Sequence, residues 1–346
     1  MVMDTSRNIL QYLQYHPNVS RQEIAEGIAF SESDATLKRL ISKEVEAGDI
    51  LMEGKARATR YRLSAQAHLT MPLDIDTYFL KEADERLVQT SFNFELITDQ
   101  LPNVIIFSEE EMQRLNAAQT LFQEHLAEIS ESQYRKEMER LGIDLSWKSS
   151  QIEGNTYSLL ETERLLRESK TAEGKTKEEA VMLLNHKEAL RYILDNQDFM
   201  KHLSVRDIED VHSILTKELS VDKGLRRRRV GITGTNYHPL DNEFQIREAM
   251  QASCDAINAR ENVFEKALLA LLLFSYIQPF MDGNKRTARL TSNAILIAFG
   301  HCPLSFRTVD SIDYKKAMLM FYEQNNFHAF KQIFISQYEF ATGEYF

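Results

Sequence analysis

The chain has 346 residues, of which 43% are hydrophobic and 27% are charged, and this balance excludes an intrinsically disordered protein. At about 150 residues per domain, the length predicts two domains. The formal net charge of -11 excludes a protein that binds polyanions over its whole surface. Any contact with nucleic acid must therefore come from a local cluster of Lys and Arg.

Cysteine usage and hydropathy exclude several further classes. Cys254 and Cys302 form no C-x-x-C pair, and no His/Cys cluster has the spacing of a zinc site. The N-terminal residues lack the apolar core of a signal peptide. The longest apolar run, residues 267–274, is shorter than the roughly 20 residues that cross a bilayer. We therefore expect a cytoplasmic protein with no membrane partner.

Residues 1–66 have the pattern of a small α+β domain. A first apolar stripe at helical spacing stops near Pro17. Ser20-Arg-Gln-Glu23 fits a capping box, in which two side chains satisfy each other's free amides at a helix start. A longer helix follows, and residues 50–63 predict a β-hairpin with a basic tip. This order of elements predicts a winged helix-turn-helix.

In such a domain the second helix of the pair enters the major groove of DNA and the wing meets the backbone. The candidate contacts are Arg39 and Lys43 on the helix, with Lys55, Arg57 and Arg60 on the hairpin. Winged helices also serve as protein–protein modules, and acidic side chains offset the cations of this domain. DNA binding and a role in a homodimer therefore both stay open.

The rest of the chain predicts a mainly helical domain. Residues 67–107 form a connector with a helix around Tyr78 to Arg86, and residues 108–346 show apolar residues at helical spacing in almost every segment. A long acidic helix starts at Ser108, and further helices are expected at 131–149, 158–169, 177–195, 204–217, 245–259, 263–277, 286–299, 311–323 and 327–341. Only the segment from Gly224 to Leu240 lacks this helical spacing of apolar residues.

The strongest local signal is a polar loop, Gln278-Pro-Phe-Met-Asp-Gly-Asn-Lys-Arg-Thr-Ala-Arg289, between two apolar helices. Gly283 permits a sharp turn that aims backbone amides inward at a helix start, where free N–H groups and the helix dipole favour an anion. The amides concerned belong to Gly283, Asn284 and Lys285. A solvated basic turn is the alternative, and the apolar helices on both sides argue against it.

Charged side chains of the same loop make the prediction more specific. Arg286 and Arg289 lie three residues apart and share one helix face, so both can reach phosphate oxygens. Asp282 supplies a hard oxygen ligand, which suits Mg²⁺ bound to phosphates. The loop therefore predicts a site for magnesium and a nucleotide.

Three segments together resemble the Fic family. The loop resembles the motif His-Pro-Phe-x-Asp/Glu-Gly-Asn-Gly/Lys-Arg-x-x-Arg at every defined position except the first. Residues 224–239 resemble the Fic flap, a β-hairpin whose edge aligns a target segment by strand addition. The flap positions that correspond are Ile232, Thr233 and Gly234. Residues 149–155 resemble the inhibitory motif Ser/Thr-x-x-x-Glu-Gly/Asn, placed before the domain core as in class II proteins.

This resemblance implies a Fic-fold helical bundle in residues 108–346 with an inhibitory helix near 149–155. It implies transfer of AMP from ATP to a Tyr, Thr or Ser hydroxyl of a target protein, with Mg²⁺ on Asp282 and the outer phosphates on Arg286 and Arg289. It also implies that Glu153, in the motif that Ser149 begins, pairs with Arg289 and occupies the γ-phosphate position. A carboxylate and a phosphate cannot both be the partner of one guanidinium.

The departure from the family lies at Gln278, where the family has the His that takes the proton of the target hydroxyl. A glutamine amide is not basic at neutral pH, and the loss of a general base costs about 10²–10⁴ in rate. The resemblance therefore implies nucleotide binding with weak or absent transfer, and whether the chain is an active enzyme stays open. Either Gln278 was engineered, or the domain is a degenerate nucleotide sensor that regulates transcription, or another group such as His238 on the flap substitutes.

Other chemistries of the same site also stay open. Asn-Lys-Arg appears in the Doc branch of the family, which transfers the γ-phosphate from an inverted nucleotide. Glu153 could instead position water for removal of AMP from a modified side chain. A platform for oligomers with a vestigial site is the third alternative, and it predicts no binding of ATP.

Overall fold

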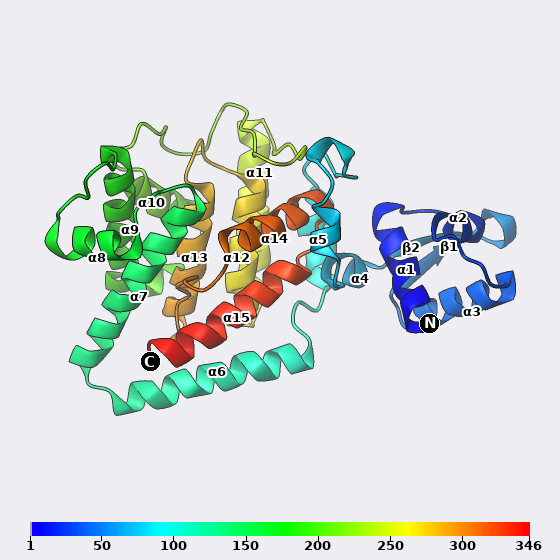
Figure 1. Cartoon of the computed structure of the whole chain (residues 1–346), viewed down its shortest axis with the longest axis horizontal. Coiled ribbons are helices and arrows are strands. Elements are labelled where there is room, and N and C mark those ends of the chain that lie inside the picture. The colour runs from blue at the N-terminus through cyan, green and yellow to red at the C-terminus, as the bar shows by residue number, and fades with distance from the viewer. Residues whose placement is uncertain (1) are drawn as a thin grey trace.

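The computed structural model describes residues 2–346, which fold into a small N-terminal unit and a larger helical body (Figure 1). The unit contains α1 (Val2–Tyr15), α2 (Arg21–Gly27), α3 (Asp34–Glu46), β1 (Ile50–Glu53) and β2 (Arg60–Leu63). The strands pair antiparallel, from Ile50 opposite Leu63 to Glu53 opposite Arg60. The predicted order of helices and hairpin is present in the structure.

Local signals explain the helix starts of the N-terminal unit. Ser20 and Glu23 form the predicted capping box at α2, and the Ser33 side chain accepts a hydrogen bond from the Thr36 amide at α3. The unit has a hydrophobic core of its own, built from all three helices and both strands. Amphipathic helices of this length need such a shared core, because short helices are marginal in water.

The connector does not contain the predicted helix around Tyr78 to Arg86. It contains α4 (Ala65–Thr70) and α5 (Ile75–Tyr78), and only short turns follow, a 3-10 turn at Ala83–Glu85 among them. Tyr78 and Arg86 both bond to the carboxylate of Glu323. A helix would separate these two positions by about 12 Å along its axis. Tertiary contacts with one buried carboxylate therefore replace the helix.

The helical body agrees closely with the predicted segments, which differ from the observed bounds by a few residues at most. Its helices are α6 (Glu109–Glu128), α7 (Glu131–Ile152), α8 (Leu159–Glu168), α9 (Lys177–Asp195), α10 (Val205–Leu215), α11 (Glu243–Asn258), α12 (Val263–Ile277), α13 (Asn284–Ala298), α14 (Ser311–Gln324) and α15 (His328–Glu344). Within residues 2–346, no helix is both long and apolar enough to span a bilayer.

The helix α12 forms the centre of the body. It packs against α11, α13 and α14, and its residues from Phe264 to Ile277 are all buried except Glu265 (Figure 1). Gln278 ends the helix with a φ of 50°, and Gly283 begins α13 with a φ of 81°. The polar loop that the sequence singled out is therefore held between two buried helices.

Residues 224–240 form an extended loop with a turn at Thr233–Gly234, so the predicted β-hairpin is wrong in its strand pairing. The only sheet in the described part of the chain is β1–β2. At the base of this loop, the buried Arg226 side chain donates to the carbonyls of Arg228 and Leu240. A side chain thus takes acceptors that a two-stranded ladder would need, and it holds the two ends of the loop together.

Candidate functional site

The loop between α12 and α13 is fixed by one of its own side chains. The amide group of Asn284 accepts a hydrogen bond from the Phe280 N–H at 2.7 Å and donates to the Phe280 carbonyl at 2.9 Å. This exchange uses both ends of the Asn284 side chain, so only its backbone amide is left for a ligand. The first amides of a helix have no partner within the helix, and the N-terminus of α13 therefore offers donors to an anion.

Gly283 turns the chain into α13 in the left-handed region of backbone conformation, at a φ of +81°. A β-carbon there would lie 3.5 Å from Thr216 Cγ2 and 3.6 Å from His212 Cδ2, which are ordinary contacts. Space is therefore available, and the backbone conformation is the reason for glycine at this position.

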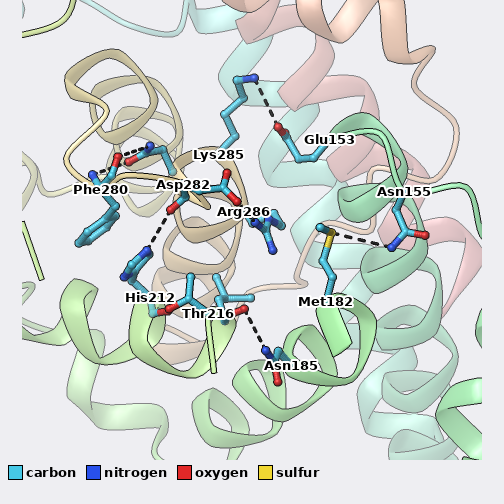
Figure 2. Close-up of polar contacts among 12 residues, drawn as sticks. Glu153, Asn155, Met182, Asn185, His212, Thr216, Phe280, Asp282, Lys285 and Arg286 are labelled. Atoms are coloured by element: carbon cyan, nitrogen blue, oxygen red, sulfur yellow. Dashed lines mark hydrogen bonds and ion pairs between the residues drawn. The ribbon is translucent and has the colours of Figure 1, made fainter. Parts of the chain in front are cut away.

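His212 on α10 contacts the loop on its α10 side, a role that no sequence pattern indicates. Its Nε2 lies 3.0 Å from the Asp282 carbonyl, and its ring stacks on Phe280 with the centroids 3.7 Å apart (Figure 2). Burial lowers the pKa of His212 to about 4. The ring is therefore neutral at neutral pH, and its Nε2–H donates to the carbonyl. In the sequence, His212 is one histidine within an amphipathic helix and belongs to no motif.

Two buried guanidiniums lie beneath the loop. The Arg286 side chain is 1% exposed and bonds to Asp282 at 3.1 Å. The Arg289 side chain is fully buried and donates from Nε to Ser149 Oγ at 2.9 Å and from Nη2 to Glu153 at 2.9 Å. In the described structure, Nε and Nη1 of Arg286 and Nη1 of Arg289 have no hydrogen-bond partner. Buried donors without partners are costly, so these three nitrogens mark a place for an acceptor.

Glu153 is the carboxylate that faces these cations. It caps the C-terminus of α7, and its second oxygen lies 3.4 Å from Lys285 Nζ (Figure 2). Burial favours a raised pKa for Glu153, but the charges of Arg289 and Lys285 prevail and hold its pKa below the ordinary value. Glu153 is therefore ionised at neutral pH. The contact between Glu153 and Arg289 that the resemblance implied is present in the structure.

A cavity of about 400 Å³ opens between this loop, the end of α7, the loop 224–240 and α14. The predicted site residues that line it are Glu153, Ile232, Thr233, Gln278, Asp282, Gly283, Asn284 and Lys285. Ser149, Arg286 and Arg289 lie buried beneath it. Gly234 does not line the cavity, because its carbonyl turns toward Arg86 of the connector.

The chemistry of the cavity fits magnesium and a polyphosphate. The Asp282 side chain is 65% exposed and lines the cavity, so one of its oxygens is accessible to a cation. Across residues 2–346 no three His, Cys, Asp or Glu side chains cluster as metal ligands. A cation here would thus depend on Asp282 together with phosphate oxygens, the usual arrangement for Mg²⁺.

Gln278 is buried, with 7% of its surface exposed. Its Nε2 donates to the Ser275 carbonyl at 2.6 Å. The amide is therefore turned back onto the preceding helix. His238, the other candidate for this role, is exposed and does not line the cavity. Its backbone pairs with the connector at Ser91 instead.

The predicted DNA contacts lie away from this site, on the N-terminal unit (Figure 1). Arg39 and Lys43 are exposed on α3, and Lys55 and Arg57 are exposed on the hairpin. Arg60 is half-buried and donates to the carbonyl of its neighbour Thr59.

The sequence does not single out two further residues of the site, Arg226 in the flap segment and Tyr314 on α14. Arg226 donates from Nε to the Gln278 carbonyl at 2.6 Å, which ties the loop 224–240 to the end of α12. The Tyr314 ring lies 5.4 Å from the Arg289 guanidinium carbon. A run of four arginines suggests a solvated surface, and a tyrosine in a helical stripe suggests core, so neither position stands out in the sequence.

Comparison with known proteins places this site in a family. Residues 202–296 match the model of the Fic/DOC family. A protein adenylyltransferase Fic from Nematostella vectensis is 30% identical over 175 residues, which cover 49% of this chain and 40% of that protein. The protein adenylyltransferase fic-1 from Caenorhabditis elegans is 29% identical over 160 residues, which cover 44% of this chain and 31% of that protein. The chain thus spans less than half the length of these relatives.

Solved structures agree in fold. Fic-1 of C. elegans, residues 134–508, superposes with a TM-score of 0.61 and 18% identity, and the match covers 100% of this chain and 97% of that one. A Fic-domain-containing signaling protein from Bacteroides thetaiotaomicron superposes with a TM-score of 0.57 and 18% identity, and the match covers 66% of this chain and 94% of that one. The mainly helical body that carries the α12–α13 loop therefore contains a Fic/DOC domain.

Proposed function

We propose that this chain is a Fic protein of the adenylyltransferase type, which binds Mg-ATP in the cavity above Arg286 and Arg289 and is inhibited by Glu153. The observation that carries the proposal is the set of three buried guanidinium nitrogens without a protein partner. Arginine donors in a fixed planar fork suit phosphate oxygens. The names of the relatives, protein adenylyltransferases, support AMP transfer as the reaction.

The predicted residues that line the cavity then have roles that their positions support. The amides of Gly283, Asn284 and Lys285 would bind the phosphates at the start of α13, and Asp282 would hold the metal. Bound Mg²⁺ would neutralise charge that develops on the phosphates. Ile232 and Thr233, which line the cavity, would align the segment of the target protein that carries the hydroxyl.

The position of Gln278 limits the rate of this reaction. In AMP transfer the target oxygen bonds to the α-phosphorus, the bond from that phosphorus to the bridging oxygen breaks, and pyrophosphate leaves. The proton of the target hydroxyl needs an acceptor. The Gln278 amide is not basic, and its N–H already donates to Ser275. We expect transfer at about 10²–10⁴ below that of a domain with a base at this position.

Glu153 would reduce the rate further. Arg289 bonds to Glu153 and Ser149 at once, so a γ-phosphate must replace the carboxylate to reach the guanidinium. A polyphosphate that is excluded from Arg289 binds in a different pose or more weakly.

The test is transfer of label from ATP labelled at the α-phosphate, by the chain itself, by Gln278→His, and by Gln278→His combined with Glu153→Gly. We expect little label from the first, more from the second and most from the third. Intact mass of the product identifies the group, because AMP and phosphate differ in mass, and a premodified product tests the removal of AMP. If the double variant transfers nothing to itself or to lysate proteins, the proposal is wrong. Addition of phosphate would favour the Doc-like alternative.

We propose a nucleotide-sensing regulator of transcription as a second candidate function, carried by the N-terminal unit. Arg39 and Lys43 stand exposed together on α3, the helix that would enter the major groove. Fluorescence anisotropy with a duplex from upstream of its own gene tests this proposal, with and without Mg-ATP. Arg39→Glu with Lys43→Glu should abolish binding. Calorimetry that detects no Mg-ATP binding would favour a vestigial site, and sedimentation would then test whether the chain forms a homodimer.

A further inference from the structure

Contacts with other segments of the chain hold the extended loop 224–240, here called the flap, in its position. It forms no ladder of its own, and one edge already pairs with the connector. The His238 amide donates to the Thr90 carbonyl at 2.9 Å, and Ser91 pairs with His238 as a parallel bridge. In Figure 1 the connector (cyan) meets this loop (yellow-green) beside the end of α14. The position of the flap therefore depends on the connector.

The turn of the flap is held by Arg86 of the connector. Its Nη2 donates to the Gly234 carbonyl and, at 2.9 Å, to Glu323, while its Nε lies 3.0 Å from the second oxygen of Glu323. The side chains of Arg86 and Glu323 are 6% and 0% exposed. One guanidinium thus joins the flap turn to the C-terminal end of α14.

Neighbouring contacts fix Glu323 and Arg86 in turn. The Tyr78 hydroxyl donates to Glu323 at 2.6 Å, and the Arg86 guanidinium lies 4.9 Å from the centre of the Phe79 ring. A second contact joins the same two segments, because the Asn236 amide donates to the Asp84 carboxylate at 2.9 Å. Arg86 and Glu323 each have more than one partner, so this network restrains the position of the flap turn.

We propose that Arg86 is a positioning residue for the flap, which holds the turn at Thr233–Gly234 so that Ile232 and Thr233 face the cavity. Because one edge of the flap is occupied at His238, a protein target must align on the segment that lines the cavity. This inference rests on the proposed function for the role of the flap, but the contact with Arg86 stands apart from the nucleotide site.

Arg86→Lys tests the proposal. A lysine keeps the charge opposite Glu323 but lacks the planar fork that bonds to Glu323 and Gly234 together. Asp84→Ala removes one of the two acceptors of the Asn236 amide, the other being the Ala83 carbonyl, so it weakens the same interface at an exposed position with little risk to folding. Arg114→Lys is the matched control, since Arg114 forms an exposed two-bond pair with Glu339 between α6 and α15.

Hydrogen exchange is measured on the full chain without nucleotide. We expect the amides of Tyr237 and His238, which donate to Thr235 Oγ1 and to the Thr90 carbonyl, to exchange about two- to tenfold faster in both test variants, the change that loss of one hydrogen bond produces. The control should leave these amides unchanged, and Mg-ATP affinity should be equal in all three. Exchange that is unchanged in Arg86→Lys and Asp84→Ala, or that rises throughout the body, overturns the inference.

A second measurement separates an effect of Arg86 on the position of the flap from an effect on the stability of the whole protein. In the background of Gln278→His with Glu153→Gly, Arg86→Lys should lower the rate of label transfer to lysate proteins several-fold while the KM for Mg-ATP stays constant. An equal loss in Arg114→Lys, or a changed KM for Mg-ATP, contradicts the proposal. A chain that binds no Mg-ATP but shows the faster flap exchange would overturn the proposed function and leave this inference standing.

Discussion

Arg289 makes the contacts that a phosphate bound in the proposed site would have to replace. It is fully buried and bonds to Ser149 of α7 and to Glu153, which caps that helix, yet its Nη1 has no partner in the described structure. A buried guanidinium gains most from a partner that saturates all its donors. Glu153 supplies one oxygen to this residue and directs the other toward Lys285, which leaves the arginine incompletely paired.

Glu153→Gln keeps the shape of the side chain and removes its charge, so Arg289 loses its competing anion. We expect Mg-ATP to bind about tenfold more tightly or better, since a hydrogen bond between charged groups is worth about 1.5–3 kcal/mol. The pKa of Glu153 is held below its ordinary value, so the gain should persist from pH 6 to pH 8. Calorimetry measures the affinity, with Glu173→Gln at an exposed position as the control. Equal affinity of the Glu153→Gln variant and the unchanged chain would show that the carboxylate does not compete.

Among the elements, α12 places the motif loop. Nearly every residue of this helix is buried, and it packs on three other helices, so its C-terminal end at Gln278 has little freedom to move. The flap contrasts with it, because it has no regular pairing and depends on Arg226 and Arg86 for its position. The motif loop is thus positioned by a buried helix, α12, whereas the flap is positioned by side-chain hydrogen bonds.

Leu271→Ala should test how far the body depends on α12. The residue is fully buried, and a truncation of this kind costs about 2–5 kcal/mol of the free energy of unfolding. Leu160→Ala on α8 is the control, because Leu160 is 76% exposed and its loss should change the free energy by less than about 0.5 kcal/mol. Urea unfolding measures both. Similar losses in the two variants would contradict the central role of α12.

Across the whole molecule, the N-terminal unit and the body meet at the connector. The rings of Tyr15 on α1 and Tyr78 stack with centroids 5.9 Å apart, and Gln14 donates to the Gln324 carbonyl at 3.4 Å. Tyr78 is the residue that also bonds to Glu323. The N-terminal unit therefore contacts Tyr78, which bonds to the same Glu323 carboxylate as Arg86 of the flap contact.

Buried histidines predict how the whole fold responds to acid. Burial lowers the pKa of His186 to about 3 and those of His68, His212 and His301 to about 4. Because the unfolded chain takes up these protons first, near pH 6.5, the stability they contribute is complete above that pH and is lost as pH falls toward 4. Glu153, with its lowered pKa, contributes nothing to the change until lower pH.

We therefore expect the thermal unfolding midpoint to fall between pH 7 and pH 5, by an amount that reflects about 1 kcal/mol or more for each histidine. His186→Gln should reduce this slope, whatever its effect at pH 7. His202→Gln at an exposed position should leave the slope unchanged. A midpoint that stays constant over this range would show that the buried histidines accept protons without cost.

Much of this architecture could be predicted from the sequence, because it depends on local patterns. Helical periodicity located the helices of the body, the capping signal of Ser20 with Glu23 located one helix start, and the acidic run after Ser108 located another. The motif loop was recognisable from residues adjacent in the chain. These features depend on interactions within a few residues, which a sequence displays directly.

The remaining features depend on contacts between distant segments. The helix expected at 78–86 gives way to a buried ion pair with Glu323, and the expected flap hairpin gives way to bonds from Arg226 and the connector. His212 reaches the Asp282 carbonyl from 70 positions away. The free energy that a local helix or strand preference contributes is small compared with the cost of a buried charge without a partner. The sequence therefore determined most of the elements and the motif turn, whereas only the tertiary structure decided which side chains hold that turn and the flap in place.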